Sequence, residues 1–270
     1  MIKSIFSLAL FTLFILSCNS NSGSVSEFEN LVNEGQFEMA YQYTMEHPDE
    51  ILDNKALLEV GKWYNEQTKF QESGEIFRRL LNQDQNDVIC KLLLANNYRE
   101  TTRYNEALAL YSSIANIDSL KLFVLPERAR LYSQIQEFQK ASVDIELAKA
   151  IEPKYFAIPL AEGMLLYAQG EQELALDMLE QAETLNPGVS SEASLYAGVM
   201  LMNMGINLDA MHKFTTAIEI GKNINLGYAY INRGICQLNL TDTTFACDDF
   251  KAALEYMPEE AQTYRDKYCN

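Results

Sequence analysis

The chain has 270 residues, of which 38 are acidic and 21 are basic, and its formal net charge is −17. This excess of carboxylates argues against binding to nucleic acid, because the phosphates would repel the protein. The length is large for one closed hydrophobic core, whereas it suits a repeat protein that grows by adding units.

The N-terminal segment predicts export. Lys3 precedes an apolar run from Ile5 to Leu16, and a polar stretch, residues 19–24, follows Cys18. About twelve apolar residues are too few to span a bilayer stably, so we interpret residues 1–17 as a cleaved signal peptide.

The motif Ile15-Leu16-Ser17-Cys18 resembles the lipobox of bacterial lipoproteins, with Ile15 standing where Leu is usual. The resemblance implies that Cys18 becomes the acylated first residue of the mature chain and that residues 18–25 form a flexible tether. It also implies a lipid anchor in the outer membrane, with the body in the periplasm or at the cell surface. An ordinary signal peptide with an incidental cysteine is the alternative.

The rest of the chain is repetitive. Small residues recur 34 to 36 positions apart, at Gly61, Ala95, Ala129, Gly163, Gly198 and Gly234. A second series of small residues recurs at the same spacing, at Ser73, Ala107, Ala141, Ala175, Ala210 and Ala246. A series of bulky residues does so as well, at Phe77, Tyr111, Ile145, Leu179, Phe214 and Phe250. Tracks that move together indicate a repeat, and two apolar stripes at helical spacing make each unit a helical hairpin.

These residues resemble the tetratricopeptide repeat (TPR), most clearly in the last unit, where Asn232-Arg233-Gly234 is followed by Ala246, Phe250, Ala253 and Pro258. Leu166, Leu201 and Gln237 depart from the family's first-helix Tyr, and Ser73 departs from its second-helix Ala. The resemblance implies an all-α, right-handed solenoid of about seven hairpins over residues 26–270, in which each unit covers its neighbour.

The last hairpin needs a cover of its own. Residues 259–269 carry Ala261, Tyr264 and Tyr268 at helical spacing and predict a capping helix. Export permits disulfides, and Cys247 and Cys269 lie symmetrically about the turn at Pro258. Pairing of Cys247 with Cys236 and the absence of any bridge remain open, and we expect Cys90 to be a small buried residue.

No motif for chemistry stands out. The sequence contains no phosphate-binding glycine loop, no Gly-x-Ser-x-Gly turn and no Cys-x-x-Cys pair, and neither His47 nor His212 has a ligand pattern around it. The acidic pair Asp248-Asp249 is expected on a solvated helix face. We therefore predict no catalysis, no metal and no cofactor.

Recognition by a surface is the remaining possibility, because the first helices of TPR units line a concave groove. The resemblance places eleven residues there: Lys62, Asn96, Arg99, Arg130, Met164, Tyr167, Tyr196, Met202, Tyr228, Asn232 and Ile235. The earlier half is polar and partly basic, and the later half is apolar and aromatic. The alternative for each residue is that it packs one unit against the next.

Two functions fit this groove. The first is a non-catalytic, lipid-anchored scaffold that binds a protein or peptide of the cell envelope, and the second is a component that binds a glycan or cell-wall fragment through aromatic rings. Protein binding is favoured, because sugars need rings flanked by many hydrogen-bonding groups and the aromatic half of the groove has few charged residues beside its rings. Neither a small-molecule substrate nor a nucleic acid is expected.

Overall fold

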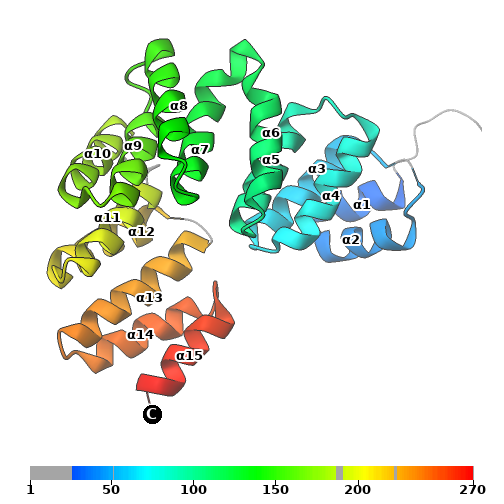
Figure 1. Ribbon diagram of the computed structural model, residues 1–270. Coiled ribbons are helices and arrows are strands. Elements are labelled where there is room, and N and C mark those ends of the chain that lie inside the picture. Colours follow the sequence, from blue (N-terminus) through cyan, green and yellow to red (C-terminus); the bar gives the residue numbers. More distant parts are fainter. Residues whose placement is uncertain (1–25, 51, 187–190, 222–223, 270) are drawn as a thin grey trace, which may run out of the picture.

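The structure, a computed structural model, describes residues 26–50, 52–186, 191–221 and 224–269. The predicted signal peptide (residues 1–17), the lipidation site Cys18 and the tether (residues 18–25) lie outside these ranges. The described ranges contain fifteen α-helices, one short 3-10 helix (η1, Asp118–Leu120) and no strand (Figure 1).

Consecutive helices pair into seven hairpins. The first helices are α1 (Glu27–Asn33), α3 (Asn54–Glu66), α5 (Val88–Glu100), α7 (Lys121–Gln134), α9 (Ala157–Gln169), α11 (Ser191–Asn203) and α13 (Ile224–Asn239). The second helices are α2 (Phe37–Glu46), α4 (Phe70–Gln83), α6 (Tyr104–Ala115), α8 (Phe138–Ile151), α10 (Gln172–Leu185), α12 (Asn207–Ile220) and α14 (Thr243–Ala253). The predicted all-α solenoid of about seven hairpins is confirmed.

The small-residue track marks where the two helices of a hairpin meet. A Cβ atom at Gly198 would lie 2.6 Å from the Phe214 ring, and one at Gly234 would lie 2.6 Å from the Phe250 ring. Both phenylalanines are fully buried. The bulky track of each second helix therefore fits into the space that the small track of the first helix leaves, which explains why the two tracks keep step along the sequence.

Each hairpin turns through one residue in the left-handed region. These seven residues are Gly35, Thr68, Thr102, Gln136, Gly170, Gly205 and Thr241, with φ between 58° and 90°. The same backbone turn thus recurs in every unit, although four of the seven positions lack the glycine that favours this conformation.

Buried arginine–aspartate pairs fix two of the hairpins. Arg128 of α7 donates to both carboxylate oxygens of Asp144 in α8 at 2.7 Å, and Arg233 of α13 does the same to Asp249 in α14 at 2.8 and 2.7 Å. The expectation of a solvated face is wrong for Asp249, which is 5% exposed, because an arginine sixteen residues earlier neutralises its charge.

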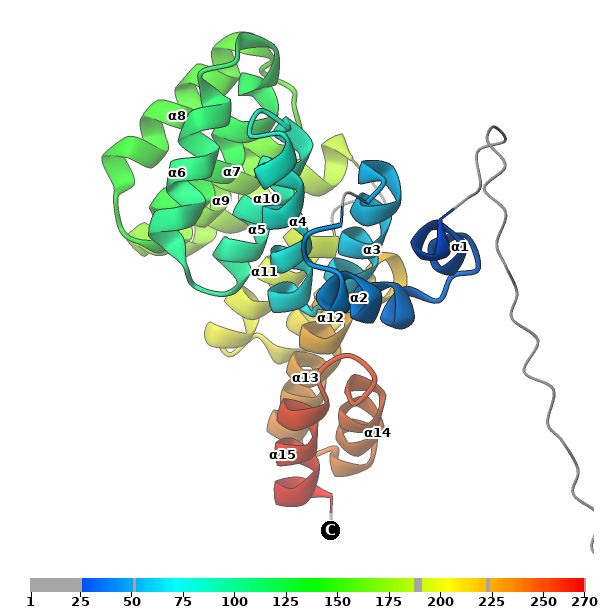
Figure 2. The ribbon, with the colours of Figure 1, turned by 90° about the vertical axis from the view of Figure 1, so that its right-hand side faces the viewer.

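Helix α15 (Pro258–Tyr268) covers the end of the stack, against α14 (Figure 2). Ala261 is fully buried there, and the Tyr264 ring stacks on the Phe250 ring with 5.2 Å between centroids. A disulfide joins Cys247 of α14 to Cys269 just beyond α15, with 5.6 Å between the Cα atoms. Cys90 and Cys236 are free thiols, and both are buried.

Candidate binding site

The hairpins follow one another round a bend, so that α3 and α5 lie on one side of a central space and α11 and α13 on the other (Figure 1). This space contains a pocket of about 790 Å³. Residues of six first helices line it, from α3 to α13, together with the turn residues Thr68 and Gln136 and with Phe70 at the start of α4. Units that are far apart in the sequence therefore contribute to one site.

Seven of the eleven residues predicted for the groove line this pocket: Asn96, Arg99, Met164, Tyr167, Tyr196, Tyr228 and Asn232. They include members of both the polar half and the aromatic half of the predicted groove. The two halves do not form successive stretches of a long channel. They face the same space, because the curvature of the solenoid brings the early and late hairpins together.

Four predicted residues lie elsewhere. Lys62 pairs with Glu59 at 3.1 Å on the partly exposed surface of α3. Met202 and Ile235 are partly buried and pack against hydrophobic clusters, as the unit-packing alternative allows. Arg130 departs from the expectation of a groove-facing side chain, since the residue is only 2% exposed.

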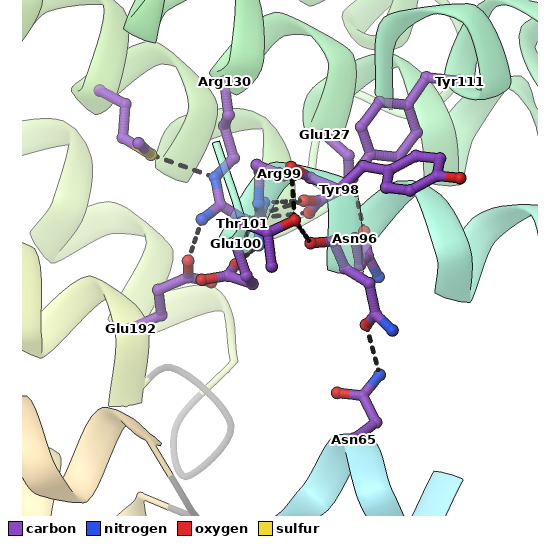
Figure 3. A network of polar contacts seen from close by, with 12 residues as sticks. Asn65, Asn96, Tyr98, Arg99, Glu100, Thr101, Tyr111, Glu127, Arg130 and Glu192 are labelled. Atoms are coloured by element: carbon purple, nitrogen blue, oxygen red, sulfur yellow. Dashed lines mark hydrogen bonds and ion pairs between the residues drawn. The ribbon is translucent and has the colours of Figure 1, made fainter. Parts of the chain in front are cut away.

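Arg130 is buried because it belongs to an ion-pair network beneath the pocket (Figure 3). Its guanidinium contacts Glu127 at 3.1 Å and also pairs with Glu192 of α11, and its Nε atom lies 3.1 Å from the Met164 sulfur. A partner 62 positions away in the sequence thus neutralises the buried charge.

Arg99 completes the network at the pocket surface. It donates to Glu127 at 2.7 Å and to Glu100 at 2.8 Å. Burial acts to raise the pKa of Glu127, but the guanidiniums of Arg130 and Arg99 outweigh it and hold that pKa below its usual range. The network joins α5, α7 and α11, so it ties the two sides of the bend together.

Aromatic side chains line the later side of the pocket. Tyr228 is 39% exposed, and the Tyr167 hydroxyl accepts a hydrogen bond from the Asn203 amide at 2.9 Å. Tyr196 is less accessible, and burial, followed by the charge of Glu192, raises its pKa. Tyr228 and Tyr167 are therefore the rings most available to a ligand.

Sequence reasoning missed several lining residues. Glu192 and Tyr228 occupy the same place relative to their unit's inward residue, seven positions before it, so the rule that found Tyr228 also applied to Glu192. Asn97 and Glu66 carry no such signal, whereas the TPR resemblance already placed Asn65 in the polar half of the groove. Asn65 donates to Asn97 at 3.0 Å, which links α3 to α5 at the early side of the pocket.

Within the described residues, no cluster of three or more His, Cys, Asp or Glu side chains is placed to hold a metal ion. No single helix there has the length and apolar character needed to cross a membrane. The segments Tyr104–Ala115 and Asp118–Gln134 reach that length and apolar character only when they are taken together, and the chain bends by 118° between them.

No protein-family model matches the chain, and no curated protein matches it either. A crystal structure of a tetratricopeptide repeat protein from Parabacteroides merdae ATCC 43184 is similar, with 19% identity and a TM-score of 0.65 over 90% of this chain and 96% of that one. A chain of the APC/C hetero-tetramer Cut9-Hcn1 is 12% identical, with a TM-score of 0.59 over 90% of this chain and 48% of that one. These likenesses show the fold: the chain is a TPR-type solenoid.

Proposed function

We propose that the protein is a non-catalytic scaffold that binds a segment of another cell-envelope protein in the central pocket. The observation that carries this proposal is the convergence of six first helices on one space that combines tyrosine rings, two methionines and side-chain amides. Rings and flexible thioethers adapt to apolar side chains of a partner, and amides can satisfy its backbone groups.

Photo-crosslinking in intact cells tests the proposal. A photoreactive amino acid at Tyr228 should give a crosslinked product with a defined polypeptide, because this ring is exposed inside the pocket. The matched control is Phe245, a 61% exposed aromatic residue that does not line the pocket. Adducts that form equally at both positions, or at neither, would contradict a pocket-based scaffold.

Glycan binding is the second candidate, and the amide-rich lining is the observation that favours it. Asn65, Asn96, Asn97 and Asn232 share the pocket with the tyrosines, and rings flanked by hydrogen-bonding groups suit sugars. The crosslinked product at Tyr228 separates the two candidates, because a protein adduct shrinks on protease digestion and a cell-wall adduct shrinks on digestion with a glycan hydrolase.

We further propose that the solenoid is anchored in the outer membrane through acyl chains on Cys18, with its body in the periplasm or at the cell surface. The lipobox-like residues before Cys18 support this, and several acyl chains together give a stable anchor. Labelled palmitate should be incorporated into the wild-type protein and not into the Cys18→Ala variant. Equal labelling of both would refute the anchor.

A further inference from the structure

The charges around the pocket do not balance. Its charged lining residues are Glu66, Arg99, Glu100 and Glu192, and Arg99 is the one cation among them. Its Nε and Nη2 atoms donate to Glu100 and its Nη1 atom donates to Glu127, so two carboxylates already neutralise the guanidinium. An anionic ligand would find no unpaired cation here and would meet three carboxylates.

The network below leaves a carboxylate in excess. Two guanidiniums, of Arg99 and Arg130, face three carboxylates, of Glu100, Glu127 and Glu192. Glu66 adds another negative charge at the end of α3, where it is exposed and has no ion-pair partner among the described residues. On the early side alone, Glu66 and Glu100 outnumber Arg99, so this side is electrostatically complementary to a cation.

The later side of the pocket suits the apolar stem of the same ligand. Tyr167 and Tyr228 offer aromatic rings, and the partly exposed Val199 offers aliphatic surface beside the largely buried Met164 and Leu195. Rings of this kind attract a lysine or arginine head group through their faces and pack against its methylene chain. One basic side chain beside one large apolar side chain would satisfy both sides of the pocket.

We propose that the pocket selects a polypeptide segment in which a lysine or arginine lies next to a large apolar residue, an inference that rests on the scaffold function proposed above. Glu66 receives the basic head group, and the tyrosines receive the apolar neighbour. Glu100 and Glu192 contribute negative potential and remain paired with Arg99 and Arg130.

A displayed library of random dodecapeptides, selected on the full-length protein, tests this directly. We expect enriched sequences to carry a Lys or Arg beside an aromatic or aliphatic residue. In the Glu66→Gln variant an enriched peptide should bind about threefold more weakly, which is the usual effect of losing one partly exposed charge pair. Added salt should weaken binding to the wild type more than binding to this variant. The matched control is Glu173→Gln, since Glu173 is an exposed glutamate of α10 outside the pocket.

The outcomes separate this inference from the scaffold function. Enriched peptides that are acidic or uncharged but lose binding in the double variant Tyr167→Ala/Tyr228→Ala would overturn the basic preference and leave the scaffold in place. Equal binding of a selected peptide by the wild type and by Glu66→Gln would also overturn the basic preference and leave the scaffold function in place. Enrichment no better on the wild type than on the double tyrosine variant would overturn both.

Discussion

At the scale of single residues, the molecule depends on small side chains where helices cross. Gly198 and Gly74 are both helical and buried, but their surroundings differ. A Cβ at Gly198 would meet the Phe214 ring at 2.6 Å, whereas one at Gly74 would meet its nearest neighbour, the Arg78 side chain, at 3.6 Å. The two glycines therefore provide a matched pair in which only one position is required to be small.

We expect opposite effects from alanine at the two sites. Gly198→Ala should lower the free energy of unfolding by about 1–3 kcal/mol, because the buried ring must move. Gly74→Ala should raise it by up to about 1 kcal/mol, because alanine favours the helix and fits there. Urea denaturation measures both changes. Equal destabilisation by the two variants would show that the close approach to Phe214 does not set the requirement.

Glu127 gives a prediction that depends on pH. Its pKa in the folded protein lies below the ordinary value of 4.5, so its ion pairs stabilise the fold fully above that value and lose their effect as the pH falls through the lower, folded pKa. Glu127→Gln removes this titration. The difference in unfolding free energy between wild type and variant should therefore be large at neutral pH and shrink in acid, and a difference that is constant or grows in acid would contradict the network.

At the scale of elements, the cap is the part most open to direct manipulation. The disulfide closes a loop across a sequence separation of 22 residues, which constrains α15 by about 3 kcal/mol in the chain-entropy treatment. Reduction should thus expose α15 to trypsin at Arg265 and Lys267, with cleavage faster by about 100-fold where opening precedes cutting. Cleavage that is insensitive to reductant would show that packing of Ala261 and Tyr264 alone holds the cap.

The buried polar pairs explain what the sequence could and could not predict. The length of the repeat, the number of hairpins and the capping helix could be predicted from small and bulky residues at regular spacing. Such residues make the contacts within a hairpin and between neighbouring hairpins. The burial of Arg130 and Asp249 did not follow, because it depends on Glu192, 62 positions away, and on Arg233 in another helix. A local pattern shows a charged residue and carries no information about a distant partner.

At the scale of the whole molecule, the shape of the site comes from accumulated rotation between hairpins. Each hairpin contacts mainly its neighbours, so a small turn repeated at each of the five junctions from α3 to α13 brings α3 and α5 to face α11 and α13 (Figure 1). The sequence predicted seven of the residues that line the pocket and left open how far the stack curls. For that reason the polar and aromatic residues were expected in separate halves of a groove, whereas they share one pocket.

Hydrogen–deuterium exchange of the full-length protein, with and without the segment captured at Tyr228, tests this shared pocket most directly. Our account predicts that binding slows exchange together in α3 and α5 on one side and in α11 and α13 on the other, and leaves the outer helices α8 and α14 unchanged. Protection confined to second helices, or to the first helix of a single hairpin, would contradict it.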